Sequence, residues 1–211
     1  ANGGNPEAKP GSRSAGAAPA GNAVEGDTAE LSAQNLKVAA VQICGYDKTD
    51  LPRPGYAPVK AVLPYIERAG NEGAQLAVFP EYILGHIHVP GVETRQIAAA
   101  AAAGRLYVII GCWERLDDGQ FANTALLFGR DGKIVGKYRK THAAVDRYEG
   151  LPPWSKPPGG KSREWFMQND PEWIMQKGED LPVFDLDFGR IGILTCYDGW
   201  FPESFRVLSL K

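Results

Sequence analysis

Residues 194–203 read Leu-Thr-Cys-Tyr-Asp-Gly-Trp-Phe-Pro-Glu and join an apolar strand to a helix. The apolar run 191–194 ends at Thr195 and Cys196, a glycine-containing turn follows, and Pro202 marks a helix start. A sharp turn of this kind pushes a side chain out of the sheet toward a cleft, as nucleophile elbows do. We therefore expect Cys196 to be a nucleophile if neighbouring groups help to remove its proton.

The composition of the 211-residue chain is that of an ordinary globular domain. Hydrophobic residues make up 44% and charged residues 23%, and the formal net charge is −2. Nothing in this charge distribution suggests a nucleic-acid footprint. Since no apolar run approaches the roughly 20 residues of a membrane helix, we expect a cytoplasmic protein that binds neither nucleic acid nor membranes.

The two ends of the chain depart from this globular pattern. Residues 1–34 are rich in Ala, Gly, Pro, Asn and Ser, a composition that predicts a disordered tail. The tail begins with Ala rather than Met, so a removed export signal is an alternative to a cytoplasmic location. At the other end, the helix pattern stops at Lys211 with no cap or breaker. We expect one domain over residues 35–211, truncated at its C-terminus.

The chain has three cysteines, Cys44, Cys112 and Cys196, and this odd, sparse count argues against a disulfide framework. Cys44 and Cys112 each close an apolar strand-like run, which is typical of a small buried thiol. No CxxC pair and no cluster of His and Cys has metal-ligand spacing, so we expect no metal site.

The apolar pattern predicts strands alternating with helices, followed by hairpins. Asp131 and Gly132 form a strong hairpin signal. Several strands are apolar throughout, which favours a mixed α/β layered fold with a sheet covered on both faces. Residues 141–181 are predicted to be a long irregular loop, a kind of segment that is often functional. The predicted strands are 37–43, 75–79, 106–112, 124–129, 133–138, 183–186 and 190–195, and the predicted helices are 57–71, 92–103 and 202–211.

Three of the predicted strands end at residues that can take part in acyl-group chemistry. Glu81 follows the second strand, Lys140 follows the strand 133–138, and Cys196 follows the last strand. If these strands end on one side of a sheet, a carboxylate, an ammonium and a thiol converge. The carboxylate can then take the thiol proton, the thiolate can attack a carbonyl carbon, and the ammonium can stabilise the oxyanion.

The residues around these strand ends resemble the three catalytic blocks of the nitrilase, or carbon–nitrogen hydrolase, superfamily. The blocks are Phe79–Tyr82, Lys137–His142 and Cys196–Glu203, and Ala40–Gln42 in the first strand is similar to the opening of that family. The resemblance runs from about residue 36 to residue 211. Each block alone is a weak signal, whereas all three in order and at strand ends are a strong one.

The resemblance implies a Glu-Lys-Cys triad of Glu81, Lys140 and Cys196 on an αββα four-layer sandwich. It also implies homo-oligomers built from dimers, and no metal or organic cofactor. Members of the family hydrolyse non-peptide C–N bonds in small amides, carbamoyl compounds or nitriles through a thioester. They usually continue past the helix at 202–211 with further strands and helices.

Many members also carry a second glutamate between the lysine and the cysteine. Glu149 lies a short way after Lys140 and is our choice for this position, while Glu164 and Glu172 are alternatives in the same long segment. The backbone N–H of Tyr197, just after the cysteine, is expected to help Lys140 to bind the oxyanion.

Three substrate classes compete within this interpretation. The Tyr-Asp-Gly sequence after Cys196 is more similar to amidases than to true nitrilases, which favours a small amide over a nitrile or an N-carbamoyl compound. A non-catalytic binding or assembly protein on the same fold is the alternative from another class. A transferase, in which an amine or lipid captures the thioester, is a third possibility.

Overall fold

The computed structural model describes residues 35–43, 56–144 and 162–211, which belong to one unit, Gln34–Lys211. The predicted tail at residues 1–34, Cys44 and Glu149 lie outside the described residues. Cys112 is buried, as its apolar strand predicts.

A mixed six-stranded sheet forms the centre of the unit. Its strands lie in the order β1-β2-β4-β5-β6, and β3 pairs with the carboxyl end of β4. Strands β1, β2 and β4 are parallel, whereas β5 is antiparallel to both β4 and β6. The strands are β1 (Val38–Ala40), β2 (Leu76–Val78), β3 (His86–His88), β4 (Tyr107–Arg115), β5 (Phe121–Phe128) and β6 (Ile134–Arg139).

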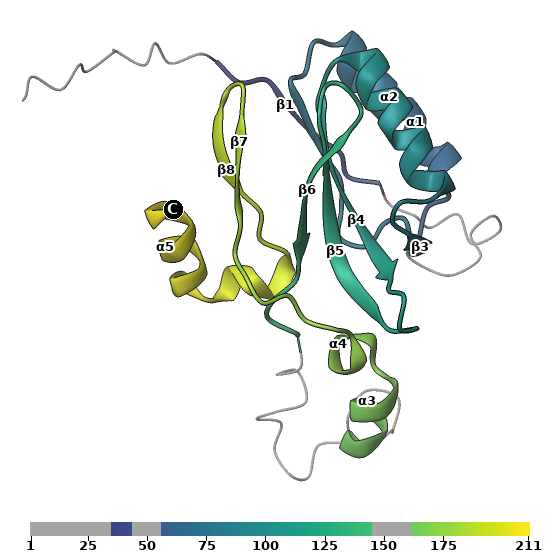
Figure 1. Ribbon diagram of the computed structural model, residues 1–211, viewed down its shortest axis with the longest axis vertical. Helices are drawn as coiled ribbons and strands as arrows, with labels where there is room; N and C mark the ends of the chain where they lie inside the picture. The colour runs from purple at the N-terminus through teal and green to yellow at the C-terminus, as the bar shows by residue number, and fades with distance from the viewer. Residues whose placement is uncertain (1–34, 44–55, 145–161) are drawn as a thin grey trace, which may run out of the picture. The chain divides into compact units, whose positions relative to one another are not determined.

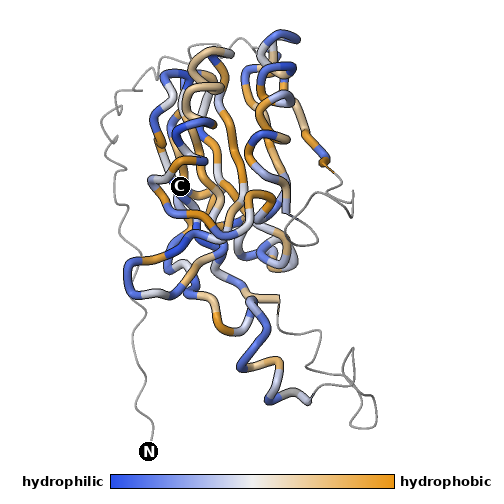
Figure 2. The backbone as a smooth tube through the Cα atoms, turned by 90° about the vertical axis from the view of Figure 1, so that its right-hand side faces the viewer, coloured by the Kyte–Doolittle hydropathy of each residue, from blue (hydrophilic) through white to orange (hydrophobic). Residues whose placement is uncertain are grey.

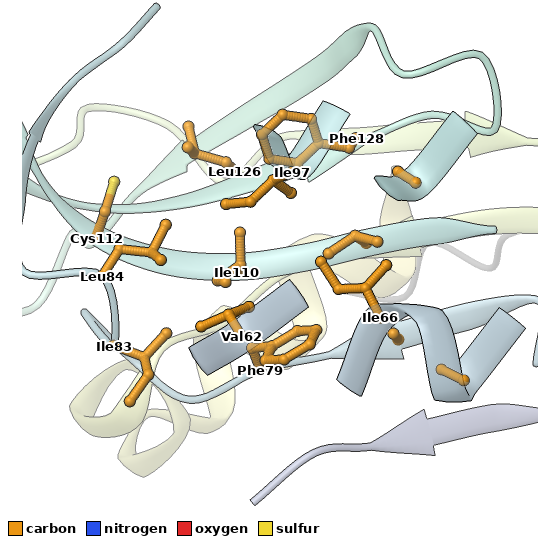
Figure 3. Close-up of a cluster of buried hydrophobic side chains, with 14 of the residues drawn as sticks. Val62, Ile66, Phe79, Ile83, Leu84, Ile97, Ile110, Cys112, Leu126 and Phe128 are labelled. Atoms are coloured by element: carbon orange, nitrogen blue, oxygen red, sulfur yellow. The ribbon is translucent and has the colours of Figure 1, made fainter. Parts of the chain in front are cut away.

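Two helices, α1 (Val59–Asn71) and α2 (Val92–Gly104), cover one face of this sheet. Val62 on α1 and Ile97 on α2 pack with Ile110 of β4 in a buried apolar cluster (Figure 3). Each fully buried side chain of this kind contributes about 1.5–3 kcal/mol.

The opposite face of the sheet packs against the hairpin of β7 (Val183–Leu186) and β8 (Gly189–Gly192). The last helix, α5 (Pro202–Leu210), lies on the outer side of that hairpin, where Leu208 packs over Gly192. The layers therefore follow the order helix, sheet, sheet, helix, as the αββα prediction requires (Figure 1). Hydrophobic residues run through the central strands, and hydrophilic ones alternate with them along the helices (Figure 2).

The structure corrects the predicted elements in several places. The predicted loop at 141–181 contains two short helices, α3 (Arg163–Asn169) and α4 (Pro171–Ile174), each begun by a capping side chain rather than by apolar periodicity. The first strand is shorter than predicted because only three of its residues pair with β2. Strand β3 was not predicted at all, since three residues are too few for a periodic signal. Within the described residues, no helix is long and apolar enough to cross a membrane.

The crossing of α1 and α2 offers a test of the helix layer. A Cβ atom on Gly70 would lie 2.9 Å from the Cα atom of Gly104 on the other helix. Although Gly→Ala normally stabilises a helix interior by up to about 1 kcal/mol, we expect Gly70→Ala to lower the free energy of unfolding by about 1–3 kcal/mol through overpacking. Urea denaturation followed by circular dichroism measures this. Asn71→Ala, at the exposed neighbouring position, should be neutral or stabilising.

Candidate active site

The sheet topology brings Glu81 and Lys140 to the same edge. Strand β6 runs antiparallel to β5, which runs antiparallel to β4, so β6 is parallel to β2. Glu81 follows β2 and Lys140 follows β6, and both therefore leave the sheet at its carboxyl edge. The Lys140 Nζ atom lies 2.9 Å from Glu81 Oε1.

The Glu81 turn lies directly on β4. A Cβ atom on Gly111 would collide with the backbone of Pro80, Glu81 and Tyr82, so only glycine allows this close approach. The Glu81 Oε1 atom also accepts a hydrogen bond of 2.6 Å from the amide Nδ2 of Asn123, on β5. Two donors thus hold one carboxylate oxygen in place.

The Lys140 ammonium is buried between two carboxylates. Its side chain is 1% exposed, and its Nζ atom lies 3.0 Å from both Oε1 and Oε2 of Glu172 in addition to its bond with Glu81. Burial alone would lower the pKa of Lys140, but the charges and hydrogen bonds of the two carboxylates outweigh it and raise this pKa above its usual value. The lysine is therefore a fixed positive charge.

Helix α4 positions Glu172. Asp170 precedes the helix, and its Oδ1 atom accepts a hydrogen bond of 2.9 Å from the Glu172 backbone N–H. The backbone N–H of Ala144 donates to Glu172 Oε2 at 2.8 Å. Of the three glutamates considered from the sequence, Glu172 is the one whose carboxylate contacts Lys140 in the described part of the chain. Glu164 lies exposed on α3.

Cys196 begins a short 3-10 helix, η3 (Cys196–Trp200), with a backbone φ of 50°. This value is uncommon for a residue with a side chain and marks the strained turn that the sequence predicts. Cys196 is exposed and lines the same cavity as Glu81. Partial burial and then the Glu81 charge raise the pKa of the Cys196 thiol, whereas Lys140 lowers it, and the net shift is upward.

A cavity of about 370 Å³ opens beside the thiol, lined by Glu81, Asn123 and Cys196 together with apolar residues of β2, β4 and β8. Tyr197, whose backbone N–H the sequence assigns to the oxyanion, follows Cys196 in η3, and its ring packs against Trp200 and Phe201. Among the residues described, no group of three His, Cys, Asp or Glu side chains could hold a metal ion.

Sequence reasoning missed Asn123 in this site and named Glu172 only as an alternative to Glu149. Asn123 is a buried amide within the apolar strand β5, and a polar side chain in such a strand is itself a signal of a specific partner. The Asp-Pro-Glu sequence at residues 170–172 is a helix-start signal that could have favoured Glu172 over Glu149.

Comparison with known proteins identifies the family. The carbon-nitrogen hydrolase family model matches residues 37–211. The chain belongs to the carbon-nitrogen hydrolase family. It is similar to an omega-amidase of Xenopus laevis, with 29% identity over 157 residues that cover 69% of this chain and 51% of the relative. It is also similar to a nitrilase of Pyrococcus abyssi, with 30% identity over 161 residues that cover 69% of this chain and 52% of that protein.

Solved structures share the fold of this carbon-nitrogen hydrolase chain. A carbon-nitrogen hydrolase from Helicobacter pylori aligns with a TM-score of 0.57 at 20% identity, covering 83% of this chain and 56% of that structure. The nitrilase-superfamily member Nit3 of Saccharomyces cerevisiae aligns with the same TM-score at 21% identity, over 82% of this chain and 59% of that one. The predicted fold class is confirmed. The chain spans about half the length of the curated relatives it matches.

The electrostatics of the site predict that Glu81→Gln makes the Cys196 thiol more acidic. Because the Glu81 charge raises the pKa of Cys196, we expect removal of that charge to lower this pKa. The rate of Cys196 alkylation by iodoacetamide, followed by mass spectrometry across pH, should then reach its midpoint at lower pH. Glu203→Gln, which removes an exposed carboxylate at the start of α5, is the matched control. An unchanged or higher midpoint in Glu81→Gln would contradict this effect of the Glu81 charge.

Proposed function

We propose that this protein hydrolyses a non-peptide C–N bond in a small amide, with Cys196 as the nucleophile. The observation that carries the proposal is the meeting of a thiol, a carboxylate and a buried ammonium that come from separate strand ends. The raised pKa of Cys196 means that the thiol is protonated near neutral pH. A general base is therefore required, and Glu81 is the carboxylate that lines the cavity together with Cys196.

In the first step, Glu81 takes the thiol proton as the sulfur attacks the carbonyl carbon. The resulting oxyanion is stabilised by Lys140 and by the backbone N–H of Tyr197. Collapse of this intermediate breaks the C–N bond, and Glu81 returns the proton to the departing ammonia or amine. A thioester on Cys196 remains.

In the second step, Glu81 takes a proton from water, and the hydroxide attacks the thioester carbon. Collapse of this second intermediate breaks the C–S bond, releases the carboxylic acid and returns the proton to the sulfur of Cys196. No atom or electron pair is left over, so the cycle needs no co-reactant besides water.

We assign the role of the second glutamate, which completes the site beside Glu81, Lys140 and Cys196, to Glu172 rather than to Glu149. Both Glu172 oxygens lie 3.0 Å from Lys140 Nζ, so one N–H can be shared between them. With a second N–H on Glu81, a third is available to the oxyanion. Glu172 thereby orients the ammonium and keeps it charged.

The similar proteins differ in the substrate class that their names give. They include omega-amidases and nitrilases at similar identity. The Tyr-Asp-Gly sequence after Cys196 favours an amide, and a nitrile is the second candidate. An N-carbamoyl compound remains the third. Assembly into dimers, a cytoplasmic location and the lack of a cofactor stay predictions.

Replacing the nucleophile tests the mechanism. Cys196→Ala should abolish turnover and leave the circular dichroism spectrum unchanged, because Cys196 is exposed and the substitution removes only one sulfur atom. Release of ammonia and amine from amide substrates is the measurement, and Cys44→Ala is the thiol control. Ammonia release by Cys196→Ala at the wild-type rate would refute the mechanism.

Substrate profiling decides between the three classes. Simple carboxamides, nitriles and N-carbamoyl compounds are supplied separately, and ammonia and carbon dioxide are measured for each. We expect the highest kcat/KM for carboxamides, and only carbamoyl substrates should yield carbon dioxide. If no class is turned over and iodoacetamide also fails to label Cys196, a binding role on the same fold is favoured instead.

A further inference from the structure

Asp198 is a fully buried carboxylate that accepts hydrogen bonds from two separate segments. Its Oδ1 atom accepts from Thr141 Oγ1 at 3.0 Å and from the backbone N–H of His142 at 2.9 Å, and it lies 3.0 Å from His142 Nδ1. Its Oδ2 atom accepts from the Tyr138 hydroxyl at 2.6 Å and from the Thr195 backbone N–H at 3.0 Å. Thr195 lies in the same turn as Asp198, whereas the other donors come from the segment 138–142.

These donors lie next to the proposed catalytic residues. Thr195 immediately precedes Cys196, and His142 follows Lys140 by two positions. We propose that Asp198 is a positioning residue that sets the place of Cys196 relative to Lys140 by joining the turn after β8 to the segment after β6. This inference rests on the proposed function, because it assigns how that thiol and that ammonium are held together.

The hydrogen-bond pattern requires a carboxylate rather than an amide. A backbone N–H can only donate, and one such donor faces each oxygen of Asp198: His142 N–H faces Oδ1 and Thr195 N–H faces Oδ2. An asparagine side chain offers a single acceptor oxygen and an NH₂ donor. In either orientation of Asp198→Asn, one backbone N–H therefore meets another donor. One of the two segments must move.

A variant that keeps the Asp198 charge separates positioning from simple charge loss. Partial burial and then the Glu81 charge raise the pKa of the Cys196 thiol more than Lys140 lowers it. If Asp198 holds the thiol beside the Glu81–Lys140 pair, Asp198→Asn moves the thiol away from both groups and lowers this pKa. Loss of the Asp198 charge alone would also lower the pKa, so a variant that keeps this charge is needed beside it.

The experiment is iodoacetamide alkylation of Cys196 across neutral to alkaline pH in the full 211-residue chain, read by mass spectrometry. In Asp198→Asn we expect the midpoint to fall below that of the wild-type chain and turnover to fall by roughly tenfold or more. Glu114→Gln is the matched control, since Glu114 is also a buried carboxylate and binds Thr124, Lys137 and Arg139 on the face of the sheet opposite to Tyr138. Glu114→Gln should lower the free energy of unfolding without moving the alkylation midpoint of Cys196.

A second variant preserves the charge and guards against misfolding of the first. Tyr138→Phe combined with Thr141→Val removes one hydroxyl donor from each oxygen and leaves the Asp198 carboxylate in place. We expect a smaller downward shift of the same midpoint, whereas a role of the Asp198 charge alone predicts no downward shift in this variant. A midpoint that is unchanged or higher in the folded variants would overturn the inference. A wild-type chain without turnover of any substrate would overturn the proposed function alone, because the alkylation midpoints are measured without substrate.

Discussion

The rest of the site depends on the contacts that the buried ammonium of Lys140 makes with Glu81 and Glu172. Removing such a charge from water costs several kcal/mol, and the cost is offset only if carboxylates surround it with good geometry. Glu81 and Glu172 provide this compensation from positions 59 and 32 residues away in the sequence. The turn after β2, the end of β6 and the start of α4 must therefore converge before the lysine can be buried. Loss of one partner from such a cluster typically costs about 3–5 kcal/mol.

The same cluster explains why the site is built on strand ends. Side chains that leave the carboxyl edge of parallel strands point into a shared space, and β-sheet pairing holds their backbones rigidly. Gly111 allows the Glu81 turn to lie on β4, and the turn with the positive φ of Cys196 brings that residue to the cavity that Glu81 also lines. Backbone strain of this kind persists only where surrounding contacts hold it, and here Asp198 supplies those contacts through both of its oxygens.

Much of the fold was predictable because its signals are local. Long apolar runs predicted β4 and β5, helical periodicity predicted α1 and α2, and Asp131 with Gly132 predicted the hairpin of β5 and β6. The elements that were missed are short. Strand β3 and helix α4 have three and four residues, and their positions are set by pairing and capping rather than by a repeating apolar pattern.

The sequence by itself determined the layered α/β fold, the family and three candidate residues, because Glu81, Lys140 and Cys196 each stand at a recognisable strand end. It favoured Glu149 over Glu164 and Glu172 as the second glutamate, and it gave no role to Asn123 or Asp198. Only the tertiary structure decided that Glu172 lies on Lys140 and that Asp198 links the cysteine turn to the lysine segment. The physical reason is that a buried charge or polar group selects its partners by distance in space, and these partners lie tens of residues apart in the chain.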